Sequence, residues 1–347
     1  MMLYSWSPVQ KFNESNFNLG IDLIKFIYKL YQESLSQPIS IPSEMKEVDL
    51  QKVQVFEALS TFTAEHGQII RPGVKQTIIG LGGISIKNPS IGVIAFRGTS
   101  NNQEWVEDVK ALRLINLSNQ TADAFSIVEK LKGVDSSSFP ESLLIGDGFF
   151  NMYSTRIGVI NRLNGCVCAS DCKDGLCYYS PNGNYSMIGS RCYNEGMIGA
   201  CNAFNRSNQS LNGQIFDFVS KMINTYKVKK FIITGHSLGG ALVNLCAFHL
   251  LHAFGPSVIH SVYSYASPRT GNTEFALSLF PLYDKYFTII NSNDLVPSLP
   301  LPWPFCFSHC GRILSFAQLT ADANCDTSYL LDMHDLETYR KNYNYIQ

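Results

Sequence analysis

Charge is scarce in this sequence. Asp, Glu, Lys and Arg make up only 16% of its 347 residues, whereas about 25% is usual in globular domains. The few charges also balance, with 27 basic and 28 acidic residues and a formal net charge of −1. Nucleic-acid-binding domains are normally strongly basic, so this balance argues against that class. It also excludes a disordered acidic tail. Hydrophobic residues reach 45%, which is enough for a full core.

Long apolar runs are absent. No stretch reaches the roughly 18 consecutive apolar residues of a membrane-spanning helix, so we expect a soluble globular protein. The N-terminal letters MMLYSWSPVQKFNESNF lack the basic start and apolar stretch of a secretory signal, which favours an intracellular protein. The nearest apolar run, residues 19–31, is interrupted by charges. It predicts an amphipathic helix whose apolar side carries Ile21, Ile24, Ile27 and Tyr28.

Cysteines point towards a different compartment. Six of the ten lie close together, at Cys166, Cys168, Cys172, Cys177, Cys192 and Cys201. Such clustering in a turn-rich stretch is typical of disulfides in an oxidising compartment. Zinc is an alternative, with Cys166, Cys168, Cys172 and Cys177 as thiol ligands, although their spacing does not match the usual paired signature. Free thiols are a third. Six glycosylation sequons, beginning at Asn13, Asn116, Asn119, Asn184, Asn205 and Asn208, do not decide between these readings.

The hydrophobic pattern predicts an α/β protein. We expect an N-terminal helical extension over 1–49, an α/β domain over 50–343 and a Cys-rich inserted subdomain over 160–209 within it. Residues 50–65 repeat apolar side chains at helical spacing and predict a helix. Further on, predicted strands at 74–86, 91–96, 230–234, 258–266, 286–291 and 312–317 and predicted helices at 212–226, 239–253, 274–280 and 334–343 largely alternate. Such alternation predicts a mostly parallel sheet flanked by helices.

One motif lies between an apolar strand and a helix. Gly235-His236-Ser237-Leu238-Gly239 has the form G-x-S-x-G, which in this setting holds a serine on a tight turn with its hydroxyl exposed. The bare pattern also occurs by chance, so the alternative is an ordinary strand-to-helix turn. The flanking strand and helix favour a nucleophile.

A serine hydroxyl needs a base, and the chain order in this kind of fold is serine, acid, histidine. Asp294 follows the predicted strand YFTIIN, and His334 lies near the C-terminus. Position alone leaves rivals for both roles: the acids Asp284, Asp332 and Asp335, and the histidines His66, His236, His249, His252, His260 and His309.

Seven segments together resemble the class 3 (fungal-type) lipases of the α/β-hydrolase superfamily. They are FRGTSNNQEWVEDV (96–109), GDGFFNMY (146–153), GHSLGGA (235–241), YASPRTGN (265–272), NSNDLVPSLP (291–300), HCG (309–311) and HDLETY (334–339). Two positions depart from the family pattern: Gly146 replaces a histidine and Ala266 replaces a glycine. The resemblance implies an α/β-hydrolase fold, with Ser237 as nucleophile, Asp294 as acid and His334 as base, and places His309 in a structural segment. The cysteine insert has no counterpart in it.

The oxyanion hole needs two backbone N–H groups. Leu238 follows the serine and Thr99 follows the strand IGVIAF, so both fit by position. The resemblance assigns Thr99 the same role and gives Asp108 the task of orienting the Thr99 hydroxyl. His236, next to the serine, is expected to support the site.

Residues 104–117 predict a short amphipathic helix, with Trp105, Val109 and Leu112 on its apolar side. Such a helix can act as a lid over an acyl groove. The alternative is a surface helix packed on the core.

Together these features predict a serine-dependent carboxylic ester hydrolase, in the first place a lipase acting on acylglycerols at a lipid–water interface. The chemistry requires neither cofactor nor metal. A phospholipase A1 or small-ester esterase is the nearest alternative, and a lipase-like binding protein without turnover is the alternative from another class.

Overall fold

In a computed structural model, the structure describes residues 12–36, 41–60, 64–65, 68–69, 75–99, 114–117, 130–154, 178–179, 186–187, 209–304, 306–317 and 332–345. Their centre is an eight-stranded sheet with the order β1-β2-β5-β6-β11-β12-β14-β16. The strands are β1 (Glu44–Met45), β2 (Leu50–Ser60), β5 (Lys75–Ser85), β6 (Ile91–Phe96), β11 (Lys230–His236), β12 (Ile259–Tyr265), β14 (Tyr286–Asn291) and β16 (Arg312–Phe316).

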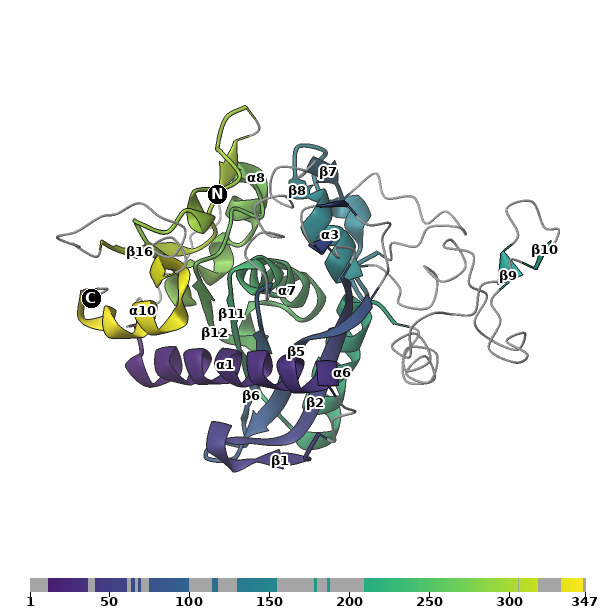
Figure 1. Ribbon diagram of the computed structural model, residues 1–347, viewed down its shortest axis with the longest axis vertical. Coiled ribbons are helices and arrows are strands. Elements are labelled where there is room, and N and C mark those ends of the chain that lie inside the picture. Colours follow the sequence, from purple (N-terminus) through teal and green to yellow (C-terminus); the bar gives the residue numbers. More distant parts are fainter. Residues whose placement is uncertain are drawn as a thin grey trace.

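The five strands from β6 to β16 run parallel, and β1, β2 and β5 join them in antiparallel pairs. Continuous apolar runs such as IGVIAF form the parallel strands because both faces of the sheet are covered. Figure 1 shows these strands side by side, with helices in front of and behind them. The carboxyl ends of parallel strands meet at one edge, which is where loops carrying chemistry assemble.

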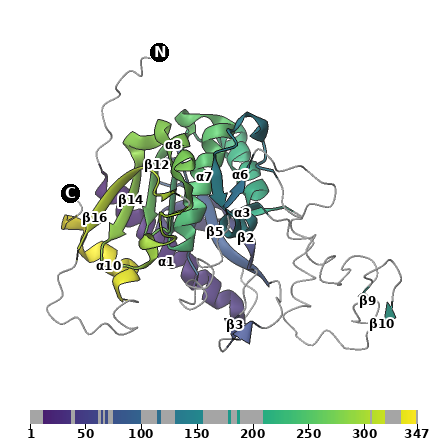
Figure 2. The ribbon, with the colours of Figure 1, turned by 90° about the horizontal axis from the view of Figure 1, so that it is seen from above.

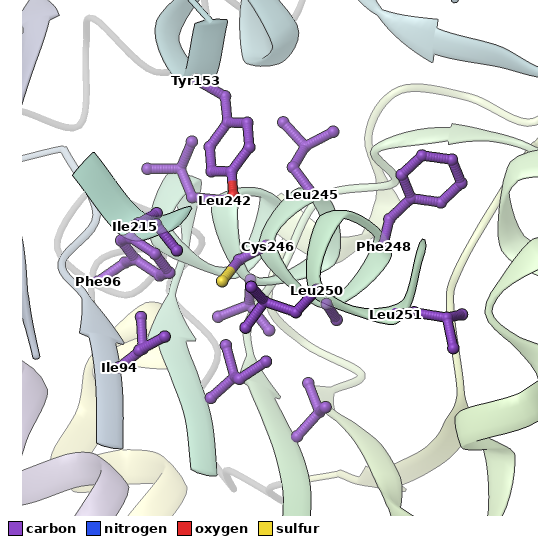
Figure 3. Close-up of a cluster of buried hydrophobic side chains, with 14 of the residues drawn as sticks. Ile94, Phe96, Tyr153, Ile215, Leu242, Leu245, Cys246, Phe248, Leu250 and Leu251 are labelled. Carbon is purple, nitrogen blue, oxygen red and sulfur yellow. The ribbon is translucent and has the colours of Figure 1, made fainter. Parts of the chain in front are cut away.

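Helices cover the two faces separately (Figure 2). One face packs against α1 (Glu14–Ser36) and α10 (Leu336–Lys341). The hydrophobic core on this face includes Phe17, Ile21, Ile24 and Ile27 of α1. The other face packs against α3 (Asp147–Ser154), α6 (Leu211–Tyr226) and α7 (Leu238–Phe254). Figure 3 shows Tyr153, Ile215 and Leu242 from these three helices beside Ile94 and Phe96 of the sheet.

Smaller elements surround the central sheet. A second sheet has the order β15-β13-β8-β7, and two hairpins pair β3 with β4 and β9 with β10. The remaining strands and the helix α8 are β3 (Ala64–Glu65), β4 (Gln68–Ile69), β7 (Leu114–Asn116), β8 (Leu144–Gly146), β9 (Tyr178–Tyr179), β10 (Ser186–Met187), β13 (Gly271–Asn272), β15 (Phe307–Ser308) and α8 (Thr273–Ser278). Among the described residues, no helix is long and apolar enough to span a membrane.

The predicted parallel core is confirmed strand by strand, but the predicted helix over 50–65 is wrong. Residues 50–60 form β2, a strand with two register irregularities. Phe56 and Ala58 pack on the α7 side of the sheet, whereas Val53 and Val55 pack on the α1 side. Because β2 is covered on both faces and irregular, its apolar residues fall at a spacing that imitates a helix.

The end of the predicted lid helix is also wrong, because residues 114–116 form the strand β7. The lid residues Trp105, Val109 and Leu112 and the candidate Asp108 lie outside the described residues. So does the insert, apart from Gln209 and the strands β9 and β10, which pair as a short hairpin. The disulfide and zinc readings of Cys166, Cys168, Cys172 and Cys177 therefore stay predictions. Cys246, Cys306 and Cys310 form no disulfide.

A buried tyrosine–histidine pair links α3 to α7. Tyr153 lies 3.1 Å from His249 Nδ1, and His249 Nε2 lies 2.7 Å from the carbonyl oxygen of Lys132. A carbonyl can only accept, so Nε2 carries the proton and Nδ1 accepts from the tyrosine hydroxyl. Burial lowers the pKa of His249 from 6.5 to about 4, which keeps the ring neutral in the folded protein.

The packing of α1 predicts a stability effect. Ile24 is fully buried, so Ile24→Ala should lower the free energy of unfolding by about 2–5 kcal/mol. The control Lys29→Ala lies on the exposed side of the same helix and should change it by less than about 0.5 kcal/mol. Denaturant titration of both variants measures this. Equal small effects would mean that α1 does not pack on the sheet.

Buried His249 predicts a pH dependence. In the unfolded chain this histidine binds a proton as the pH falls below its ordinary pKa of 6.5. In the folded protein its pKa is about 4, so it binds the proton only near that pH. Lowering the pH through that window therefore favours unfolding, by about 1.4 kcal/mol per pH unit for this group. In His249→Gln the slope of unfolding free energy against pH should be smaller by that amount. Unfolding titrations from pH 7 to 4.5 test this, and an unchanged slope would contradict it.

Candidate active site

A strained turn between β11 and α7 carries the candidate nucleophile. Ser237 has φ 59° and ψ −127°, a conformation that residues with side chains rarely adopt. Its backbone N–H donates to Tyr265 O of β12 at 2.9 Å, and its carbonyl accepts from Gly240 N–H at 2.8 Å. The turn is thus held by the neighbouring strand and by the first turn of α7.

Glycines make the turn possible because the chain approaches itself closely there. A Cβ at Gly235 would lie 2.4 Å from Gly239 O, and one at Gly239 would lie 2.5 Å from Arg97 O. A Cβ at Gly98, after β6, would lie 2.7 Å from Ser237 Cβ. The loop after β6 therefore presses directly against the serine, and only glycine fits at these contacts.

The candidate acid Asp294 follows β14 at the same edge of the sheet. Its side chain is 1% exposed, and three donors surround it. Oδ1 accepts from Val296 N–H at 2.9 Å, and Oδ2 accepts from Tyr339 Oη at 2.8 Å. The third is His334, whose Nδ1 lies 2.7 Å from Oδ2. Three donors therefore fix the orientation of this buried side chain.

The candidate base His334 lies just before α10, for which Asp335 is the N-cap. Because its Nδ1 is bound to Asp294, proton exchange with a serine would use Nε2. The His334 ring lies 4.6 Å, centroid to centroid, from the ring of His236, which immediately precedes Ser237. Three segments distant in sequence therefore meet at the carboxyl edge of the sheet.

Two further residues hold the acid and base segments together. Tyr339 receives the backbone N–H of Asn291 at 3.1 Å and donates to Asp294. The Asn291 side-chain amide donates to Met333 O at 2.9 Å. Sequence reasoning missed both roles. Tyr339 lies in the segment HDLETY, one turn of α10 beyond His334, which is the one local signal that could have pointed to it.

The rival histidines have other partners. His236 binds Tyr28 Oη through Nδ1 at 3.2 Å and His334 O through Nε2 at 2.8 Å, and burial lowers its pKa well below 6.5. His309 Nε2 lies 2.9 Å from Pro297 O, and burial lowers its pKa to about 4. His249 binds Tyr153, and His260 lies 3.1 Å from Ser261 Oγ. His66 lies outside the described residues.

The rival acids are placed elsewhere. Asp335 accepts from Glu337 N–H as the cap of α10, and Asp332 O accepts from Thr338 Oγ1. Asp284 precedes β14, at the opposite edge of the sheet from Asp294.

Each oxyanion candidate follows a residue of the nucleophile turn or of the loop packed against it. Leu238 begins α7, and the N–H of a first helical residue has no acceptor within the helix. Thr99 follows Gly98, which contacts Ser237. Ala266, which stands where the lipase pattern has glycine, has φ 49°, in the region that favours glycine. Across the described residues, no group of three or more His, Cys, Asp or Glu side chains is placed to hold a metal ion.

Comparison with curated proteins finds several relatives over part of their lengths. The chain is 32% identical to phospholipase A1-Iα2 of Arabidopsis thaliana over 38% of this chain, and 36% identical to lipase ZK262.3 of Caenorhabditis elegans over 30%. It is 32% identical to triacylglycerol lipase OBL1 of Nicotiana tabacum over 30%. These alignments span only 31%, 29% and 20% of the relatives' own lengths.

Among solved structures, a triacylglycerol lipase from Penicillium expansum aligns with 89% of this chain and 82% of its own, at a TM-score of 0.49 and 15% identity. The family model described as lipase (class 3) matches residues 93–303, which is more than half of the chain. That match contains the loop after β6, the turn at Ser237 and the acid Asp294, three of the elements that meet at the carboxyl edge. The chain belongs to the class 3 lipase family.

Proposed function

We propose that this chain is a serine-dependent carboxylic ester hydrolase that hydrolyses acylglycerols through an acyl-enzyme. Ser237 Oγ attacks the ester carbonyl while His334 Nε2 takes its proton, and Asp294 orients and stabilises the resulting imidazolium. The imidazolium then donates that proton to the leaving alcohol. A water attacks the acyl-enzyme by the same route, and the fatty acid leaves. The Thr99 and Leu238 amides stabilise the negative oxygen in both steps.

One observation carries the proposal: Asp294 and His334 form a buried pair at 2.7 Å, and the His334 ring lies 4.6 Å from the ring of His236, the residue before a serine held in a strained turn at the start of a helix. A fold that only binds lipid needs neither a buried charge nor a strained serine, and both cost stability. The retention of both therefore favours turnover over the binding-protein alternative.

The loop that follows Asp294 favours a lipid substrate. Residues 295–304 contain no charged side chain, yet Leu301 is 65% and Trp303 is 83% exposed. The Arg269 guanidinium donates to Ser298 O and Pro300 O, at 2.5 Å and 2.8 Å, which holds the loop in place. An exposed tryptophan with neighbouring leucines is typical of side chains that enter the lipid–water interface. We therefore place the lipid surface against this apolar loop.

A phospholipase A1 is the second candidate, because proteins with that activity are among the relatives. The two activities share the mechanism and the apolar loop and differ in the head group that the site accepts. If the predicted helix that carries Trp105, Val109 and Leu112 acts as a lid, activity should rise above the substrate's solubility limit.

Removal of the nucleophile is the first test. Ser237→Ala should lower the hydrolysis rate by about a thousandfold or more and abolish labelling by a fluorophosphonate. Ser298→Ala, in the loop beside the site, is the matched control because its side chain has no role in the mechanism, and it should label normally. Hydrolysis of short-chain and long-chain glycerides and of a phospholipid, measured on the purified protein, separates the two candidate substrates. A folded wild type that neither labels nor hydrolyses any ester would support the binding protein instead.

The apolar loop predicts a difference between dissolved and aggregated substrate. Trp303→Gln removes a side chain whose transfer into an apolar phase is worth about 1.5–3 kcal/mol, so activity on an emulsion should fall by about tenfold or more. Activity on a dissolved short-chain ester should stay unchanged.

The matched control for that comparison is Phe280→Gln. Phe280 is also an exposed aromatic residue, but it lies before β14, at the opposite edge of the sheet. It should behave as wild type on both substrates. Equal losses in the two variants, or a loss for Trp303→Gln on the dissolved ester, would refute lipid contact by this loop.

A further inference from the structure

The N-terminal helix α1 reaches the candidate active site although it lies outside the family match, which begins at residue 93. Its contacts include β5 and also β6 and β11, the two strands that lead into the oxyanion loop and the nucleophile turn. Two of its aromatic residues, Tyr28 and Tyr31, lie one turn apart on the side that faces the site. Neither has been used in the mechanism above.

The backbone N–H and the carbonyl of Gly98 both have hydrogen-bond partners near α1. The Gly98 N–H donates to Tyr28 Oη at 2.9 Å. The Gly98 carbonyl accepts from Arg97 Nη1 at 2.6 Å, and the Arg97 guanidinium stacks on the Tyr31 ring at 3.7 Å. The Gly98 carbonyl and the Thr99 N–H belong to one planar trans peptide unit, so they point in opposite directions. Binding the carbonyl on one side therefore directs the Thr99 N–H to the other.

The same tyrosine hydroxyl reaches the nucleophile turn. His334 O can only accept, so His236 Nε2, at 2.8 Å, must carry a proton. The buried ring is neutral, which leaves Nδ1 as an acceptor for the Tyr28 O–H at 3.2 Å. Tyr28 thus accepts from the oxyanion loop and donates to His236, and His236 donates to the backbone of the base.

The base segment is held on both sides of this contact. Met333 O accepts from Asn291 and His334 O accepts from His236. Further out, Lys25 and Asp22 of α1 form ion pairs of 2.5 Å with Glu337 and Arg340 of α10. Exposed pairs of this kind contribute little each, so the buried bonds through Tyr28 and His236 are the main link between α1 and the base.

We infer that Tyr28 is a positioning residue for ester hydrolysis, which holds the oxyanion loop at the Gly98 N–H, next to the peptide of the Thr99 amide, and fixes the place of His334, through one hydroxyl shared by Gly98 and His236. This inference rests on the proposed function. Interactions that matter only when the oxyanion forms lower kcat and leave KM unchanged when they are lost. A merely structural tyrosine would lower stability without that selective effect on kcat.

The chain contains a matched control. Tyr153 binds His249 Nδ1 at 3.1 Å, and His249 Nε2 binds Lys132 O at 2.7 Å, so this second relay has the same chemistry. Tyr153 is fully buried, whereas Tyr28 is partly buried. His249 lies twelve residues beyond Ser237 on α7, which is about 18 Å along the helix axis. Tyr153→Phe therefore removes an equivalent hydroxyl away from the site.

The experiment compares Tyr28→Phe with Tyr153→Phe on a dissolved short-chain ester. We expect kcat of Tyr28→Phe to fall by about tenfold or more, since complete loss of an oxyanion donor costs about a hundredfold. KM should stay within twofold, and Tyr153→Phe should keep the wild-type kcat. Amide hydrogen exchange is the second readout, and Gly98 should exchange at least about tenfold faster in Tyr28→Phe alone, because its acceptor is gone.

The two readouts separate the two claims. A wild type without hydrolysis would refute the proposed function, whereas exchange at Gly98 would still show whether Tyr28 orients the loop. Equal kcat in the two variants, or equal exchange at Gly98, would overturn the inference. An equal loss of kcat in both variants would reflect reduced stability alone.

Discussion

Ser237 holds a backbone conformation that costs a residue with a side chain about 1–3 kcal/mol, and the rest of the site depends on that turn. The strain persists because Gly235, Gly239 and Gly98 have no Cβ to obstruct three close approaches of the chain. The turn places the serine at the N-cap of α7 and brings the loop after β6 against it. Had any of the three carried a side chain, the strand, the helix and the oxyanion loop could not meet at one point.

The parts that meet at this turn come from both faces of the sheet. The serine begins a helix of one face, whereas the base precedes α10, which packs with α1 on the other. A buried acid at the end of β14 contacts the base and Tyr339. Both layers thus contribute side chains at the sheet edge, and the hydrogen bonds that cross it give a rigid arrangement for charge that develops in the transition state.

Residues whose chemistry is local could be predicted from the sequence. The G-x-S-x-G turn, the parallel strands and the order of serine, acid and histidine are carried by short segments, and the structure brings Asp294 and His334 together. The strand β2 was mistaken for a helix because both of its faces are covered. The partnership of Tyr28 with His236 joins residues 208 positions apart, so no local pattern contains it. The tyrosine was visible only as one member of an amphipathic helix, the role that most such residues have.

The most direct measurement is a crystal structure of the chain with a phosphonate bound covalently to a serine. The account predicts the adduct on Ser237, a phosphonyl oxygen within hydrogen-bonding distance of the Leu238 and Thr99 amides, and His334 Nε2 facing the adduct while Nδ1 keeps its bond to Asp294. An adduct on another serine, or a His334 ring turned away from the phosphorus with Asp294 bound elsewhere, would contradict it.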